Sequence, residues 1–202
     1  MEFVFIRHGQ SEHNAHLTTD LDSAITPAGA QQAKELGKWL NANWPSISTY
    51  EGLCSPYLRC LQTARILKEE CGLRSTVDPG PMEIRIGFFQ PEVPCRVDEY
   101  RDMNWDLFPE PMKLGRETME EFMARMQGFL DTFGVKGRHP GKSWWERWVV
   151  ISHGTPCETL AELAAGIYRV PTDFDKMKNC SLSWVDQGEI VYFNKVVYGD
   201  HG

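Results

Sequence analysis

The chain has 202 residues, of which 42% are hydrophobic and 24% charged, and its formal net charge is −7. This length suits one well-buried domain and is short for two, so we expect residues 1–202 to form a single domain. The acidic balance and the lack of interleaved basic and aromatic residues argue against a nucleic-acid partner. No apolar run approaches the length that a membrane span requires, so no membrane partner is expected.

The six cysteines are scattered along the chain without a CxxC pair. An apolar strand pattern begins at Glu2, so we expect no signal peptide. Both features favour reduced thiols and a cytoplasmic protein. The cysteines are Cys54, Cys60, Cys71, Cys95, Cys157 and Cys180.

Strand-like and helix-like patterns alternate along the chain, which predicts an α/β domain with a largely parallel sheet. The strand-like runs lie at residues 2–6, 53–54, 148–152, 180–185 and 190–197. A Ser or Thr N-cap followed by Pro is a strong signal for the start of a helix. This signal predicts helices that begin at Thr26-Pro27, Ser55-Pro56 and Thr155-Pro156.

The middle of the chain has a different composition. Four prolines and several aromatic residues lie between residues 87 and 115, and Thr118 and Glu121 then form a capping-box pattern at the start of a helix. We interpret residues 87–135 as a cap inserted over the carboxyl ends of the strands. Residues 134–142, rich in Gly and basic side chains, predict an exposed loop.

Two strand-like runs end on the same dipeptide, which is His8-Gly9 in one case and His153-Gly154 in the other. Ligands bind at the carboxyl edge of open α/β sheets, so we expect both imidazoles at one site there. Arg7 places a forked cation beside His8, suited to a phosphate or a carboxylate. A lone histidine is usually structural, but one between Arg and Gly at a strand end favours a functional site.

Three further residues are candidates for the same site. Arg59 lies in the first turn of a predicted helix, where a cation opposes the helix dipole, so an anionic ligand explains its position better than solvent does. Glu83 lies between apolar neighbours, where a raised pKa would make it a proton donor, while a salt bridge to Arg85 stays open. Asn14 could donate an amide hydrogen bond to an oxyanion, or it could serve a turn.

Together, these residues predict a phosphate site that uses no metal or other cofactor. The two arginines would bind the phosphoryl oxygens, and one histidine would attack phosphorus while the other steadies the equatorial charge. Glu83 would protonate the leaving oxygen.

The segment Arg7-His8-Gly9-Gln10-Ser11-Glu12-His13-Asn14 resembles the signature of the histidine phosphatase superfamily, also called phosphoglycerate mutase-like. Residues 25–33, 55–64 and 151–154 resemble its other motifs, in the family's order. Four motifs in order over nearly the whole chain make the resemblance specific.

The resemblance implies a three-layer α/β/α fold, in which a mixed, mostly parallel sheet lies between helices. It also implies that His8 becomes a phosphohistidine and that Arg7, Arg59 and His153 complete the phosphate pocket, where Gly154 also binds. Glu83 would be the proton donor and Asn14 a phosphate contact. The branch that this chain resembles uses no metal.

The chain departs from the family pattern in two places, neither of which removes a core catalytic group, and the second changes the cap and so the substrate. Gln10 replaces a glutamate that many relatives carry, and residues 87–91 replace an aromatic-Glu-Gly run. The insertion is short and acidic, whereas mutases of the family carry a longer and more basic one. We therefore prefer a phosphatase to a mutase. The acidic residues of the insertion include Asp98, Glu99, Asp102, Asp106 and Glu110.

Other functions remain open at this point. A mutase of the same mechanism class, or a phosphate-binding protein without activity, would share the fold. A metal enzyme that uses His8, His13 and His16 is the poorest choice, because Arg7 would repel a cation. The expected partner is a small-molecule or peptide phosphoester, and a homodimer is also open.

Overall fold

The structure, a computed structural model, describes residues 1–84, 117–133, 146–171 and 177–199. In these ranges the strands form a six-stranded sheet with the order β3-β2-β4-β1-β5-β6. Strands β3, β2, β4 and β1 are parallel, β5 is antiparallel to β1, and β6 is antiparallel to β5. The strands are β1 (Glu2–Arg7), β2 (Glu51–Cys54), β3 (Ser75–Val77), β4 (Arg147–Ser152), β5 (Leu182–Asp186) and β6 (Glu189–Lys195).

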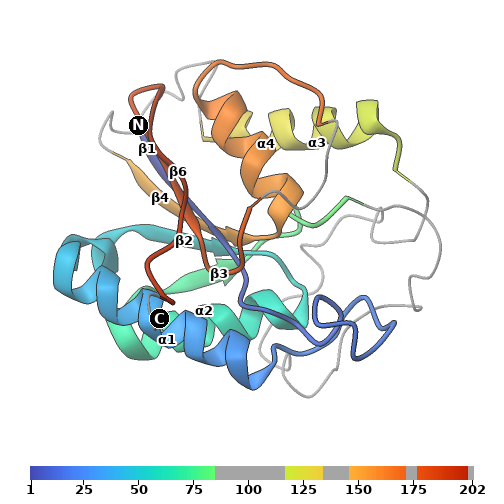
Figure 1. Cartoon of the computed structure of the whole chain (residues 1–202). Coiled ribbons are helices and arrows are strands. Elements are labelled where there is room, and N and C mark those ends of the chain that lie inside the picture. Colours follow the sequence, from blue (N-terminus) through green and yellow to red (C-terminus); the bar gives the residue numbers. More distant parts are fainter. Residues whose placement is uncertain (85–116, 134–145, 172–176, 200–202) are drawn as a thin grey trace.

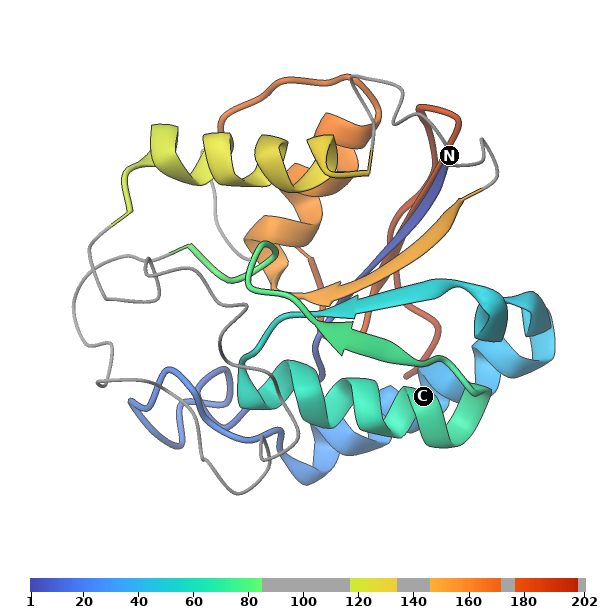
Figure 2. The ribbon, with the colours of Figure 1, turned by 180° about the vertical axis from the view of Figure 1, so that it is seen from behind.

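Helices cover both faces of this sheet, as Figure 1 shows. On one face lie α1 (Pro27–Asn43) and α2 (Leu58–Cys71), and a short 3-10 helix (Pro45–Thr49) leads from α1 to β2. On the other face lie α3 (Met119–Asp131) and α4 (Gly154–Ala164), which Figure 2 shows side by side from behind. The predicted α/β/α fold with a mixed, mostly parallel sheet is confirmed.

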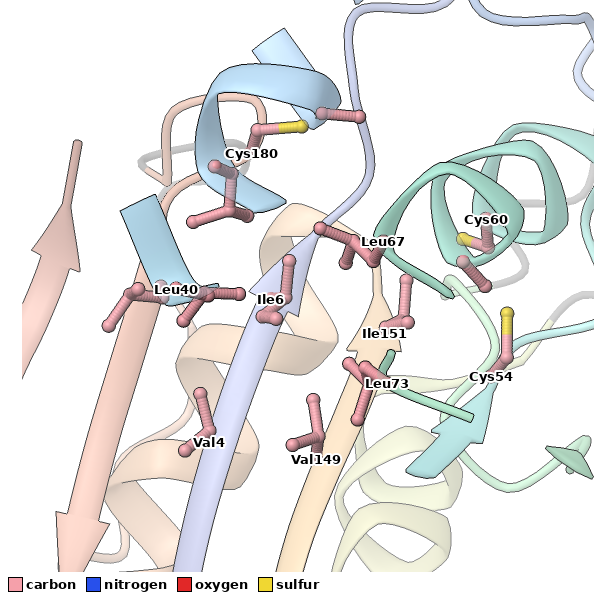
Figure 3. Close-up of a cluster of buried hydrophobic side chains, with 14 of the residues drawn as sticks. Val4, Ile6, Leu40, Cys54, Cys60, Leu67, Leu73, Val149, Ile151 and Cys180 are labelled. Atoms are coloured by element: carbon pink, nitrogen blue, oxygen red, sulfur yellow. The ribbon is translucent and has the colours of Figure 1, made fainter. Parts of the chain in front are cut away.

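Strand β1 is buried on both of its faces. Val4 and Ile6 pack toward α1 and α2 in the core cluster of Figure 3, where Leu40 and Leu67 come from those helices. Phe5, one position along, packs instead with the side chains of α3 and α4. Burial of each large apolar side chain contributes about 1.5–3 kcal/mol, so β1 is firmly fixed and its carboxyl end is well placed.

Two of the predicted helix starts are confirmed. The Thr26 hydroxyl accepts a hydrogen bond from the Gly29 N–H at 3.0 Å, and Pro27 is the first residue of α1. The capping box before α3 is formed as the sequence predicts.

The other two starts are wrong by two residues each. Helix α2 begins at Leu58, and Asp22 rather than Ser55 accepts its first N–H, at 2.7 Å. Helix α4 begins at Gly154, with His153 in the N-cap position, so Thr155 lies inside the first turn. In both places the Ser/Thr-Pro pattern does not mark the start of the helix, because tertiary contacts at the strand ends determine where the helix begins.

Of the segment expected as a cap, residues 87–135, the structure describes residues 117–133. Their helix α3 packs on the sheet face beside α4 and buries Phe122, Met126 and Leu130 in the core, so this part belongs to the helical layer. The remainder of the expected cap, residues 87–116 and 134–135, lies outside the described residues, and so does the expected loop at 134–142.

Two expectations about the whole chain can be compared with the described ranges. There, no helix is both long and apolar enough to span a lipid bilayer. The five cysteines in these ranges are free, buried thiols, and Cys95 lies outside them.

Candidate active site

The two predicted histidines meet at the carboxyl edge of the sheet. Arg7 is paired with Ser152 across the parallel strands β1 and β4, so His8 and His153 leave neighbouring strands at the same level. Both side chains are buried, and their ring centroids lie 5.3 Å apart at an interplanar angle of 70°.

Arg59 joins the two imidazoles. Its Nε donates to Nε2 of His8 at 3.0 Å, and its Nη2 lies 2.9 Å from Nδ1 of His153. The third nitrogen, Nη1, donates to the carbonyl oxygen of Leu21. The guanidinium also lies over the Tyr57 ring, 4.6 Å from its centroid. Arg59 is therefore fixed from several sides at the first turn of α2, as the sequence predicted for its position.

These contacts define which ring nitrogens carry protons, because a guanidinium can donate hydrogen bonds but cannot accept them. Nε2 of His8 accepts from Arg59, which leaves the proton on Nδ1, where it is donated to the Gly9 carbonyl at 2.7 Å. Nδ1 of His153 likewise accepts from Arg59, and Nε2 donates to the Ser55 hydroxyl at 2.9 Å. Each imidazole thus presents an unprotonated nitrogen to the same cation.

The surroundings keep both histidines neutral. Burial lowers the pKa of His8 well below its usual value, and the cations of Arg59 and Arg7 lower it further. Burial also lowers the pKa of His153, with Arg59 the largest charge effect. A neutral imidazole with a free lone pair is the nucleophilic form of histidine, so the site favours nucleophilic chemistry.

The remaining predicted residues also lie at this edge. Arg7 is the buried last residue of β1 and donates from Nη1 to the carbonyl oxygen of Met177. Gly154 is the first residue of α4, whose amino terminus favours anions. The Asn14 side-chain oxygen accepts from Asn179 Nδ2 at 3.3 Å, and the same nitrogen donates to the His8 carbonyl at 3.1 Å.

Glu83 approaches the site from the loop after β3. Its Oε2 lies 4.0 Å from Nδ1 of His153, and its side chain keeps 23% of its surface exposed. Its Oε1 accepts from the N–H of Ile84 at 3.0 Å. Arg85, the alternative ion-pair partner, lies outside the described residues. The carboxyl therefore stands beside the histidine pair and in contact with solvent.

Two residues at the site have roles that sequence reasoning missed. Ser55 was interpreted as an N-cap, but its hydroxyl binds His153. Asn179 orients Asn14 by occupying its side-chain oxygen, and the sequence around it carries no signal of this. Both contacts join segments that are far apart along the chain.

A metal centre gains no support from the geometry. Over the four described ranges, no three His, Cys, Asp or Glu side chains come together in an arrangement that could hold a metal ion. His16 is exposed at the surface, away from the buried His8. The positive charge at the site comes instead from arginine side chains.

Comparison with known proteins relates the chain to named enzymes. "Probable phosphoglycerate mutase GpmB" from Enterobacter sp. (strain 638) is 26% identical over 94% of this chain and 86% of its own length. A broad-specificity phosphatase from Saccharomyces cerevisiae is 27% identical over 76% of this chain and 66% of its own.

Solved structures share the fold. The mycobacterial glucosyl-3-phosphoglycerate phosphatase, solved in complex with VO3, has a TM-score of 0.61 at 21% identity and covers 92% of this chain and 90% of its own. A structure named "Mycobacterial hydrolase 1" has a TM-score of 0.66 at 18% identity, with 96% and 98% covered. A family model of the histidine phosphatase superfamily (branch 1) matches residues 3–192, so the chain belongs to this enzyme superfamily.

Proposed function

We propose that this protein is a metal-independent phosphomonoester hydrolase that forms a phosphohistidine on Nε2 of His8. The observation that carries the proposal is the Arg59 bridge between two buried, neutral histidines. A phosphoryl group has the charge and the acceptor atoms to replace the direct contact between Arg59 and Nε2 of His8. Arginine suits this role because its forked donors match phosphate oxygens.

In the first half of the reaction, the lone pair of His8 Nε2 forms a bond to phosphorus while the bond to the ester oxygen breaks. Negative charge on the equatorial oxygens is met by Arg7, Arg59 and the amide of Asn14. The amino terminus of α4 at Gly154 contacts the same oxygens, and His153 steadies their charge through Arg59, because its unprotonated Nδ1 accepts from that guanidinium. Fixed donors of this kind act mainly by electrostatic stabilisation of the transition state.

Glu83 transfers a proton in each half of the reaction. Its carboxyl protonates the leaving oxygen in the first half, since an alkoxide is a poor leaving group. In the second half the resulting carboxylate takes a proton from water, whose oxygen attacks phosphorus. The bond to Nε2 then breaks, which releases inorganic phosphate and restores neutral His8. The Glu83 side chain is 23% exposed, so it can contact both the substrate and solvent.

We favour water over a second substrate hydroxyl as the acceptor. The support comes from the sequence, where the insertion after Glu83 is short and acidic and therefore poorly suited to a second anionic group. A small-molecule or peptide phosphoester is the proposed substrate. The relatives named as mutases favour transfer between hydroxyls as the second candidate. Five buried free thiols suit a reducing compartment, and we propose a cytoplasmic location.

Hydrolysis of p-nitrophenyl phosphate in excess EDTA tests the proposal. We expect the wild type to keep its activity in the chelator and His8→Ala to lose it. His16→Asn, a change of an exposed histidine in the same part of the chain, is the matched control and should match the wild type. Mass spectrometry after rapid quenching should show one phosphoryl group on wild-type protein, labile to acid, and none on His8→Ala. Substantial turnover by His8→Ala would exclude this nucleophile.

A second assay separates hydrolysis from transfer. Protein phosphorylated at His8 is mixed with phosphoglycerate, and the fate of the phosphoryl group is followed. Release of inorganic phosphate at the same rate with and without the acceptor supports a hydrolase. Rapid appearance of bisphosphoglycerate would instead establish the mutase alternative.

A further inference from the structure

Arg125, on α3, lies outside the group of residues that face the histidines, yet it contacts both flanks of residues 85–116. Directly after this segment, the Arg125 Nε and Nη2 donate to the two carboxylate oxygens of Glu117, at 2.8 and 2.7 Å. This is a bidentate pair, the strongest geometry available to a guanidinium and a carboxylate.

Just before this segment, the same guanidinium binds the backbone that carries Glu83. Nη1 donates to the carbonyl oxygens of Gly80 and Met82 at 2.7 and 2.9 Å, and Nη2 reaches the carbonyl of Glu83 at 3.4 Å. A single side chain thus binds three carbonyl groups within four residues.

The contact is well supported on both sides. The Glu117 side chain is only 1% exposed and that of Arg125 21%, so water competes weakly for these hydrogen bonds. Phe129 of α3 packs directly on Gly80, and the Ser152 hydroxyl at the end of β4 donates to the Pro81 carbonyl. The loop before Glu83 is therefore attached to α3 on one side and to the strand that carries His153 on the other.

We infer that Arg125 is a positioning residue for Glu83. By fixing the backbone on both sides of Met82, it sets the distance at which the Glu83 carboxyl stands from the histidine pair, 4.0 Å from Nδ1 of His153. Glu117 completes the unit because it fixes the orientation of the guanidinium. This inference rests on the proposed role of Glu83 as the proton donor.

The test compares substrates that differ in their need for a proton. An aryl phosphate leaves readily as the anion, whereas an alkyl phosphate needs protonation, so loss of the acid selectively harms the alkyl substrate. Arg125→Lys keeps the charge but loses the fork that reaches several acceptors. We expect kcat/KM to fall about 10-fold for glycerol phosphate and less than about 3-fold for p-nitrophenyl phosphate. Arg65→Lys, which alters an exposed ion pair on α2, is the matched control.

A double-mutant cycle shows whether the effect passes through Glu83. In a Glu83→Gln background, Arg125→Lys should cause no further change in the ratio of alkyl to aryl kcat/KM. Because Arg125→Gln would leave Glu117 buried without its cation, the double variant Arg125→Gln/Glu117→Gln is included as a charge-neutral version. Thermal melting confirms that each variant is folded before the kinetics are compared.

The outcomes separate this inference from the proposed function. If Glu83→Gln changes the substrate ratio but folded Arg125→Lys lowers both activities equally, Arg125 has a general structural role and the inference is overturned. The same holds if Arg125→Lys changes the ratio further in the Glu83→Gln background. If Glu83→Gln itself leaves the ratio unchanged, the acid assignment fails, and the positioning role fails with it.

Discussion

The Ser55 hydroxyl lies 2.9 Å from Nε2 of His153, on the opposite side of the ring from the nitrogen that faces Arg59. The Sγ of Cys60 also lies near this nitrogen, at 3.6 Å, but sulfur is a weak acceptor. Ser55 therefore orients the imidazole and accepts the Nε2 proton of the tautomer that the Arg59 contact selects. The serine of the Ser55-Pro56 pair, which the sequence suggests as an N-cap, binds His153 instead of capping α2.

Loss of that hydroxyl should impair catalysis without unfolding the protein. For Ser55→Ala we expect kcat/KM for p-nitrophenyl phosphate to fall about 10-fold, which corresponds to about 1.4 kcal/mol and the loss of one good hydrogen bond. Ser46→Ala, on the exposed 3-10 helix, is the control. Equal activities of the two variants would show that the orientation of the His153 imidazole does not depend on Ser55.

Arg59 is expected to be more important, because it contacts both imidazoles. Arg59→Met should lower kcat/KM by at least about 100-fold, as the loss of a transition-state donor does. Because the Arg59 charge lowers the pKa of His8, its removal should raise that pKa, which NMR titration of the imidazole can follow even in an inactive variant. Arg65→Met, on the exposed face of the same helix, should change neither quantity. An unchanged His8 pKa in Arg59→Met would contradict this account.

The buried histidines should also make stability depend on pH. An unfolded histidine has a pKa of about 6.5, whereas burial lowers the pKa of His8 and His153 in the folded state. Below pH 6.5 the unfolded chain therefore binds more protons, so the free energy of unfolding should fall as the pH falls. Each histidine contributes a slope of up to about 1.4 kcal/mol per pH unit, and neither contributes above about pH 7.5.

Urea unfolding between pH 7.5 and 5 measures this slope. In His8→Gln one buried imidazole is removed, so the slope should be shallower than in the wild type by up to about 1.4 kcal/mol per pH unit. His16→Asn, at an exposed position, should keep the wild-type slope. Identical slopes in wild type and His8→Gln would mean that His8 is protonated equally in both states.

A close backbone approach holds the start of α1 against the loop that follows His8. A Cβ added to Gly29 would lie 2.1 Å from the carbonyl oxygen of Gln10, and one added to Gly9 would lie 2.5 Å from the carbonyl oxygen of Gly29. Neither backbone atom can move without disturbing the site. Glycine at these two positions is therefore a requirement of packing.

Gly29→Ala should destabilise the protein by about 1–3 kcal/mol, as overpacking does, and should also reduce activity. Gly128→Ala is the matched control, because Gly128 lies in α3 with open space around its Cβ position. Alanine is the better helix former, so the free energy of unfolding of Gly128→Ala should rise by about 0.5–1 kcal/mol. Chemical denaturation measures both, and a neutral Gly29→Ala would show that the α1 start can shift at no cost.

Much of the fold could be predicted because its main signals are local. The buried runs at residues 2–6 and 148–152 identified the two central strands, and Thr26-Pro27 identified the start of α1. Strand β3 (Ser75–Val77) was missed because three residues are too few to show a strand period. The starts of α2 and α4 were misplaced because the same Ser/Thr-Pro pattern serves both capping and strand-end sites.

The site was predictable where a residue's function follows from its place on an element. His8, His153 and Arg59 each lie at a strand end or a helix start, and the structure brings them together. Asn179 and Arg125 act through contacts across distant segments, which no local pattern reveals. The chemical roles of all the site residues stay predictions until the variants above are measured.

The position of β1 has a consequence for how the molecule is made. This strand pairs with β4 on one side and with β5 on the other, both of which come from the last third of the chain. During synthesis, its run of Phe3, Val4, Phe5 and Ile6 must therefore wait for partners that emerge much later. Such long-range pairing slows folding and leaves an apolar segment exposed to aggregation and to chaperones. The proposed nucleophile thus follows a strand that is translated well before its partners β4 and β5, and its surroundings are assembled only after they emerge.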